Sequence, residues 1–135
     1  MENWILPCNV RFFDVEKHFE EHDTVVWKRG ASTKEGDVVY LYLGAPYSQI
    51  LYRCIVEKEE LTKEEVEENK YAVRAGATPK TKYMLLKLEY KYKEGTMTLD
   101  KLREHGLGQT QKQARTSRSV QGFINSINKT ISNDR

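Results

Sequence analysis

Short apolar runs, separated by polar and turn-forming residues, recur along the chain and predict short strands. Five segments are rich in β-branched and aromatic residues, and they lie at residues 4–8, 24–27, 38–43, 50–56 and 86–92. In the last segment, Leu and Tyr alternate with Lys and Glu, which is the pattern of a strand with one buried face. A short turn containing glycine and proline separates the third and fourth segments, so we expect these two strands to pair antiparallel.

Helical periodicity and capping residues predict four short helices between and after these strands. Asp14 is a suitable N-cap for the first helix, and Thr62 with Glu65 forms a capping-box pattern for the second. The third helix is expected to end at Gly106, and an apolar stripe at helical spacing marks the fourth. The expected helices lie at residues 15–22, 63–69, 99–105 and about 117–131, followed by a frayed tail at 132–135.

These elements predict an α+β fold in a single domain spanning residues 1–135. The strands are spread along the chain with short helices between them, and the sequence shows no βαβ rhythm and no repeat. A length of 135 residues suits one domain. We therefore expect a small twisted β-barrel of mixed or antiparallel strands with peripheral short helices.

Composition adds an expectation about the setting of the protein. Charged residues make up 31% of the chain, and no apolar run approaches the roughly 20 residues that cross a bilayer. The N-terminal segment lacks the basic and apolar regions of a secretory signal. Cys8 and Cys54 each lie in a predicted strand, which favours buried free thiols, with one disulfide as the alternative. We expect a cytoplasmic protein without a membrane partner.

Basic charge is concentrated towards the C-terminal end of the chain. The formal net charge is only +2, but residues 98–135 carry seven basic side chains against three acidic ones. Acidic residues gather instead around residues 57–68. This bias favours a C-terminal surface that faces phosphate, and a solvated charged helix face is the alternative.

Catalytic motifs are weak in this sequence. His18 and His22 form an H-x-x-E-H pattern, which would place two zinc ligands on one helical face. The predicted helix is short, however, and His105 is the only other histidine, so two ordinary surface histidines are the stronger interpretation. Asp37, Glu89 and Lys91 resemble the acid-acid-lysine set of metal-dependent nucleases only faintly. We expect no enzyme, no bound metal and no cofactor.

Residues suited to binding a nucleobase are better represented. Trp27 ends a predicted strand and is followed by Lys28 and Arg29, so its ring could stack on a base while the cations hold phosphate; a core tryptophan is the alternative. Asn9 follows the first strand, where its amide could meet a base edge. Residues 44–47 form a strand exit that permits close approach, and residues 109–115 form an amide-rich loop that suits phosphate.

The order of these features along the chain resembles that of the EVE domain. The sequence Trp4-Ile5-Leu6-Pro7-Cys8-Asn9, a short helix, Trp27 and then Gly36-Asp37-Val38-Val39-Tyr40-Leu41-Tyr42 carry the resemblance, which continues to residues 109–115. The related YTH domain, another member of the PUA-like superfamily, is similar too. The resemblance implies a twisted barrel whose open side receives one flipped base. It also implies that Trp27 forms a wall of an aromatic cage, that Cys8 and Asn9 line the base edge, and that Arg115 contacts phosphate.

The resemblance leaves the second aromatic wall open among Tyr42, Tyr47 and Tyr71. The function it implies is recognition of a modified base, such as 5-methylcytosine or N6-methyladenine, in DNA, with an effector such as a modification-dependent restriction nuclease as partner. RNA as the ligand, a small hydrolase using His18 and His22, and a protein-interaction module without a pocket are the alternatives. The expected base-binding residues are Cys8, Asn9, Trp27, Tyr42, Gly44 and Tyr47, and the expected phosphate-binding residues are Lys28, Arg29, Arg103, Lys112 and Arg115.

Overall fold

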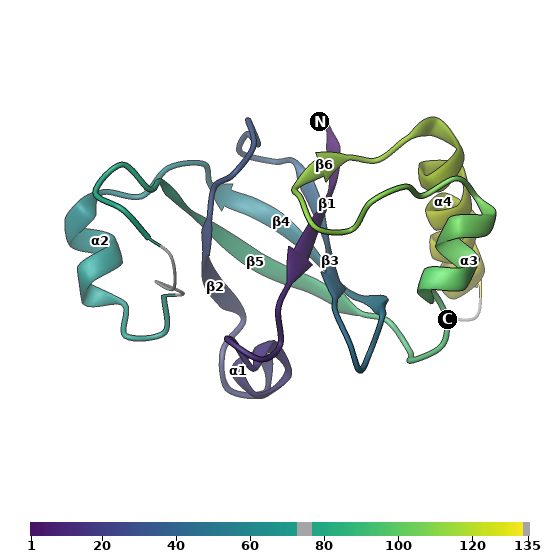
Figure 1. Cartoon of the computed structure of the whole chain (residues 1–135), viewed down its shortest axis with the longest axis horizontal. Coiled ribbons are helices and arrows are strands. Elements are labelled where there is room, and N and C mark those ends of the chain that lie inside the picture. Colours follow the sequence, from purple (N-terminus) through teal and green to yellow (C-terminus); the bar gives the residue numbers. More distant parts are fainter. Residues whose placement is uncertain (73–76, 134–135) are drawn as a thin grey trace.

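The computed structural model describes residues 1–72 and 77–133, and these residues form a single curved sheet with helices around it (Figure 1). Helix α1 lies at the lower end of the sheet in this view, α2 at one side, and α3 with α4 at the other side. In chain order the elements are β1 (Asn3–Cys8), α1 (Val15–Glu21), β2 (Thr24–Lys28), β3 (Val38–Leu43), β4 (Gln49–Lys58), α2 (Lys63–Glu68), β5 (Tyr83–Lys91), α3 (Leu99–Glu104), β6 (Ala114–Arg115) and α4 (Arg118–Asn133).

The sheet is mixed, as the sequence predicts. Its strand order is β2-β5-β4-β3-β1-β6, in which β1 pairs parallel with β3 and every other pair is antiparallel. The expected antiparallel pairing of β3 with β4 is confirmed. The expectation of a barrel needs a correction, because the sheet is open. Strands β2 and β6 are the two edges of the sheet and do not pair with each other, and β6 is only two residues long.

Two buried clusters on opposite faces of the sheet explain why all six residues of β3 are buried. Alternate residues of β1 show the division, since Trp4 and Leu6 lie in one cluster and Ile5 lies in the other. The first cluster joins α1 to side chains from both β1 and β2, although three strands separate these two in the sheet. The sheet therefore wraps around this cluster and brings the ends of β1 and β2 close together. The second cluster lies beneath α3 and α4.

The helices follow the capping signals in the sequence. The Asp14 side chain accepts from the Lys17 N–H, and Thr62 with Glu65 makes both bonds of a capping box. Helix α4 differs from its expectation at the end, because Ser132 and Asn133 are still helical and do not fray; residues 134 and 135 lie outside the described residues. Val120 and Ile124 of α4 are fully buried, which fits the apolar stripe predicted for this helix. The described helices are all too short or too polar for a membrane span.

Candidate nucleic-acid interface

The ends of β1 and β2 enclose a cavity of about 230 Å³, which we call the aromatic cavity. Strand β1 ends there at Cys8, and β2 ends there at Trp27 and Lys28. The turn that follows β1 and the loop that precedes β6 complete the enclosure. The lining residues are Pro7, Cys8, Asn9, Phe12, Phe13, Trp27, Lys28 and Gln113.

Three aromatic side chains surround the aromatic cavity. Trp27 lies opposite Met84 of β5, and only 7% of its surface is exposed, so most of the indole belongs to the core. Its Nε1–H has no hydrogen-bond partner within the described residues, which leaves one donor at the cavity. Phe13 packs edge-on against Trp27 with 6.1 Å between the ring centroids, whereas Phe12 is 71% exposed. A buried ring and an exposed ring thus stand at one hollow, which is the arrangement that suits stacking on a flat ligand.

The turn after β1 holds its shape through the backbone and side chain of Asn9. The Asn9 carbonyl accepts from the N–H groups of Phe12 and Phe13 at 3.0 and 3.2 Å, and its Oδ1 accepts from the Arg11 N–H at 3.0 Å. The side-chain amide N–H groups of Asn9 have no partner within residues 1–72 and 77–133, so they remain available to an acceptor on a base.

Cys8, beside Asn9, is a protonated thiol at neutral pH. Burial, with a smaller contribution from the Asp14 carboxylate, raises the pKa of Cys8 to about 12. A thiolate is the nucleophilic form of cysteine, so this side chain offers the cavity an apolar surface and no nucleophile. Cys8 and Cys54 are both buried and free, as the sequence predicts.

Gln113 joins the loop before β6 to the end of β2. Its Nε2 donates to the Lys28 carbonyl at 2.9 Å, and its Oε1 accepts from the Gly30 N–H at 2.8 Å. These two bonds connect segments more than 80 residues apart, at the place where the open sheet lacks a backbone ladder.

We expect Gln113→Ala to weaken oligonucleotide binding about threefold to tenfold, because the cavity wall loses both bonds and each contributes roughly 1 kcal/mol. The free energy of unfolding should fall by about 1–2 kcal/mol, since two hydrogen bonds of roughly 1 kcal/mol each are lost. Fluorescence anisotropy and urea unfolding measure the two quantities. Gln121→Ala on α4 is the matched control, and equal binding by Gln113→Ala and the wild type would contradict the assignment of Gln113 to the cavity wall.

A second hollow of about 480 Å³ lies next to the aromatic cavity, and we call it the polar hollow. Residues 7–9 line both, so the end of β1 is their common wall. The Gly44 N–H donates to the Cys8 carbonyl at 3.1 Å, which holds the exit of β3 beside the exit of β1. The lining residues are Pro7, Cys8, Asn9, Arg11, Tyr42, Gly44, Ala45, Thr110 and Gln111.

The structure brings five of the six predicted base-binding residues to these two hollows. They are Cys8, Asn9, Trp27, Tyr42 and Gly44. The sixth, Tyr47, lines neither hollow; its hydroxyl donates to Glu16 Oε2 at 2.8 Å and its ring packs against the first core cluster. Sequence reasoning missed the residues Phe12, Phe13, Arg11 and Gln113. An aromatic pair in a turn, where small polar residues are usual, was the available signal for the phenylalanines.

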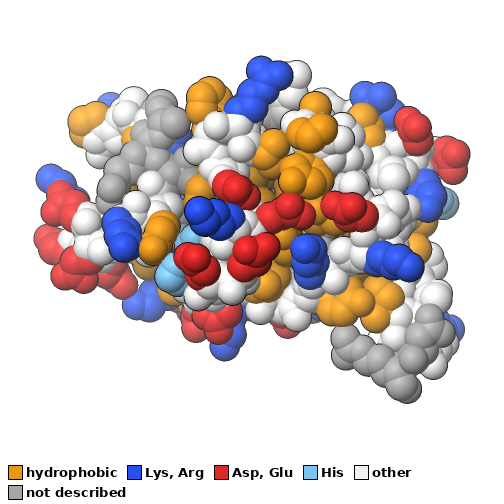
Figure 2. Space-filling model, turned by 90° about the horizontal axis from the view of Figure 1, so that it is seen from below, with side chains coloured by type: hydrophobic (Ala, Val, Ile, Leu, Met, Phe, Trp, Pro, Cys, Tyr) orange, Lys and Arg blue, Asp and Glu red, His pale blue; other side chains and the backbone are white. Residues whose placement is uncertain are grey.

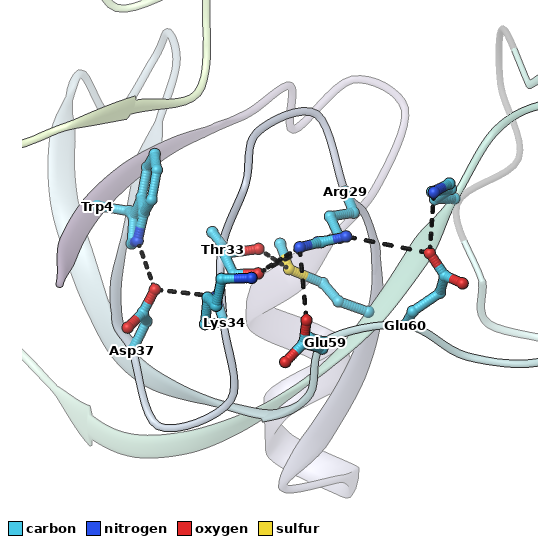
Figure 3. A network of polar contacts seen from close by, with 9 residues as sticks. Trp4, Arg29, Thr33, Lys34, Asp37, Glu59 and Glu60 are labelled. Atoms are coloured by element: carbon cyan, nitrogen blue, oxygen red, sulfur yellow. Dashed lines mark hydrogen bonds and ion pairs between the residues drawn. The ribbon is translucent and has the colours of Figure 1, made fainter. Parts of the chain in front are cut away.

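Arg29 differs from its predicted role as a phosphate ligand. Its guanidinium donates twice to the Thr33 carbonyl, at 2.6 and 3.2 Å, and lies 3.7 Å from Glu59 and 4.0 Å from Glu60 (Figure 3). Only 14% of the side chain is exposed. Two carboxylates already balance this charge, so Arg29 ties the end of β2 to the segment after β4 and lines neither hollow.

The other predicted phosphate ligands are divided in space. Lys28 lines the aromatic cavity, and Arg103 lies exposed on α3, outside both linings. Lys112 and Arg115 line a smaller hollow of about 140 Å³ before α4. Arg115 stacks over the Trp4 ring at 5.2 Å and lies 3.9 Å from Glu2, so a carboxylate shares its charge.

The histidine pair lies apart from both hollows. His18 is buried, its Nε2 lies 2.7 Å from the Thr24 carbonyl, and burial lowers its pKa, so the neutral ring is favoured. The centroid of its ring lies 4.8 Å from that of the His22 ring, and the two rings are tilted by 31°. In the described part of the chain, no three His, Cys, Asp or Glu residues form a group that could hold a metal ion. The two acidic residues that faintly resemble a nuclease set already have partners within the protein. Asp37 accepts three hydrogen bonds, and Glu89 forms an ion pair with Arg53.

Charge around these hollows is uneven. Seen from the α1 end, acidic side chains lie on the side of α2 and also across the middle of the face, where basic and hydrophobic side chains lie among them (Figure 2). Of the described residues that line the aromatic cavity and the polar hollow, none is acidic, whereas Arg11 and Lys28 are basic. The side chains of the two linings therefore favour an anionic ligand over a cationic one, in spite of the small net charge.

Comparison with solved structures identifies the fold. A mutant of the ASCH protein from Zymomonas mobilis superimposes with a TM-score of 0.70 at 11% identity, covering 94% of this chain and 99% of that one. A hypothetical protein from Leishmania major gives 0.67 at 15% identity, covering 98% and 97%. ASCH domains belong to the PUA-like superfamily. The fold is PUA-like. The α+β prediction is thus confirmed, whereas the resemblance to the EVE domain in particular stays a prediction. No family model and no curated protein matches the sequence.

Proposed function

We propose that this protein is a nucleic-acid-binding module that takes one unstacked base into the aromatic cavity. The observation that carries the proposal is the meeting of Trp27 with Phe12 and Phe13 at a cavity that has Lys28 at its edge and no acidic lining residue. The PUA-like fold, shared with ASCH proteins, supports a nucleic-acid ligand.

Size and energetics favour a single base. The aromatic cavity, at about 230 Å³, is below the roughly 300–1,000 Å³ of pockets for drug-sized ligands, so it suits one heterocycle. Unstacking a base costs a few kcal/mol, and less when the base is already unpaired. One aromatic stack returns about 1–3 kcal/mol, and hydrogen bonds from Asn9 and the indole N–H would add to this. The balance suits micromolar binding to a single strand or a flipped base.

A methylated base is the ligand that we propose within this class. Pro7, the protonated thiol of Cys8 and the three aromatic rings give the aromatic cavity an apolar wall. Burying one methyl group there contributes roughly 0.8 kcal/mol, or about a fourfold preference over the unmodified base. We therefore propose 5-methylcytosine or N6-methyladenine, in DNA first and in RNA as the second candidate. Because the chain resembles EVE domains, we also propose an effector nuclease as its partner.

We propose binding without catalysis at this site. Cys8 carries the one thiol or hydroxyl group among the described residues that line the aromatic cavity, and its raised pKa keeps it protonated. The histidine pair lines neither the aromatic cavity nor the polar hollow.

Fluorescence anisotropy with short single-stranded oligonucleotides tests the proposal. The set holds DNA and RNA versions of one sequence, each with a single 5-methylcytosine, a single N6-methyladenine or no modification. We expect micromolar binding and at least a fourfold preference for one modified form, since the methyl group is buried. Equal affinity for modified and unmodified strands of both kinds would refute base reading, and absence of binding would refute the nucleic-acid ligand altogether.

A further inference from the structure

The polar hollow is a continuation of the proposed base site, because residues 7–9 line it as well as the aromatic cavity. It is the larger of the two, at about 480 Å³ against 230 Å³. A base that enters the aromatic cavity remains covalently joined to a sugar and to phosphates. The sugar and a phosphate of the same strand are therefore the groups that the bound base itself brings next to the polar hollow.

The polar hollow presents hydrogen-bonding side chains that the protein itself does not use. Within residues 1–72 and 77–133, the guanidinium of Arg11 and the side chains of Thr110 and Gln111 have no hydrogen-bond or ion-pair partner. Three arginines differ in this respect, because Arg29, Arg53 and Arg115 each lie within 4 Å of a glutamate. Among the described residues, Arg103 and Arg118 share the unpaired state of Arg11 but line neither the aromatic cavity nor the polar hollow. Arg11 is thus a cation without a counter-charge at the edge of a hollow whose described lining residues include no carboxylate.

The backbone around these side chains is ordered by its own hydrogen bonds. Asn9 Oδ1 fixes the turn that carries Arg11. On the opposite side, Gln109 Oε1 accepts from the N–H groups of Gln111 and Lys112 at 2.8 and 2.9 Å. Two hydrogen-bonded turns therefore present the unpaired groups. A ligand that binds them costs less conformational entropy than one that must first order a flexible loop.

We infer that the polar hollow holds the sugar and phosphate next to the base in the aromatic cavity, with Arg11 contacting that phosphate. This inference rests on the proposed function and extends it from one base to a nucleotide with its linkage. A guanidinium matches the geometry of phosphate oxygens, and the free donors of Thr110 and Gln111 suit the sugar and the ester oxygens. The site would then be specific for a base within a strand over the same base as a free heterocycle.

Single methylphosphonate linkages test this inference, because they remove the charge of one phosphate and leave the base unchanged. The probes are oligonucleotides with the modified base preferred in the anisotropy titration, carrying a neutral linkage on its 5′ side, on its 3′ side or at a distant position. We expect one of the two flanking linkages to weaken wild-type binding about fivefold to tenfold. Arg11→Gln should weaken the native strand equally and should be insensitive to that linkage, while it keeps the preference for the modified base.

The matched control is Arg103→Gln, which makes the same charge change on α3 and should retain full sensitivity to the linkage. The inference is overturned if neither neutral flanking linkage weakens wild-type binding. It is also overturned if the sensitive linkage, once neutral, weakens binding equally in Arg11→Gln and in the wild type. Either result leaves the base site standing when the preference for the modified base persists. Loss of that preference in the wild type itself would instead overturn the proposed function.

Discussion

Trp27→Ala is expected to lower the affinity for the modified oligonucleotide by about 5- to 150-fold, since one base–aromatic stack contributes roughly 1–3 kcal/mol. The same change also removes a core side chain, because only 7% of Trp27 is exposed, and should reduce the free energy of unfolding by about 3–5 kcal/mol. Binding and thermal unfolding must therefore be measured together. Loss of affinity in a sample that is still folded is the informative result.

Phe12→Ala separates binding from folding. Phe12 is 71% exposed, so its truncation should change the free energy of unfolding by no more than about 0.5 kcal/mol. Affinity should still fall about fivefold or more, because the ring stands at the open side of the aromatic cavity. Tyr71→Ala is the matched control, since Tyr71 is an exposed aromatic residue that lines neither hollow. Unchanged affinity in Phe12→Ala, with a loss in Tyr71→Ala, would place the ligand elsewhere.

Asp37→Asn is expected to lower the free energy of unfolding by about 3 kcal/mol, although the two side chains have the same shape. The Asp37 carboxylate is buried and accepts from the Trp4 indole N–H and the Lys34 backbone N–H, each at 2.9 Å (Figure 3). It also accepts from the Glu2 backbone N–H at 2.9 Å. An amide of the same shape would turn an N–H group towards one of these donors, and hydrogen bonds to a charged acceptor contribute about 1.5–3 kcal/mol. The bonds hold the start of β1 against β3, so they also set the register that places Cys8 and Asn9 at the hollows.

The same carboxylate predicts how the stability of the wild type depends on pH. Burial alone would raise the pKa of Asp37, but the three donors outweigh it and hold the pKa below its usual range. A lowered folded-state pKa stabilises the protein above the unfolded-state value of about 3.9, and this contribution is lost as the pH falls through the folded-state value. Urea unfolding between pH 3 and pH 7 should show a smaller loss on acidification for Asp37→Asn than for the wild type. Asp23→Asn, an exposed control, should follow the wild type; an Asp37→Asn profile parallel to the wild type would contradict this account.

Local features of the fold could be predicted from the sequence because their causes are local. The caps at Asp14 and Thr62 act within one helical turn, and both are present. The strands follow from runs of β-branched and aromatic residues. The open sheet could not be predicted in this way, because its strand order joins segments far apart in the sequence, and the side chain of Gln113 replaces a ladder at the gap.

The same distinction applies to the candidate site. Trp27 and Cys8 lie near the ends of predicted strands and Asn9 follows one, and the resemblance to the EVE domain implied that all three belong to one base site. Arg29 has the same local character as Lys28, but its partners Glu59 and Glu60 lie about 30 residues further along the chain, and nothing near Arg29 in the sequence indicates them. In the sequence, Gln113 is one of several amide side chains in a polar loop, and nothing there distinguishes it as the residue that binds Lys28 and Gly30.

The indole N–H resonances of the two tryptophans provide the most direct measurement of whether a base enters the aromatic cavity. Trp4 donates its N–H to Asp37 inside the protein, whereas the Trp27 N–H has no partner in the described part of the chain. Titration of the ¹⁵N-labelled protein with the preferred modified oligonucleotide should shift the Trp27 resonance through the ring current of the stacked base and leave Trp4 nearly unmoved. A saturated complex in which the Trp27 resonance stays in place would contradict the account.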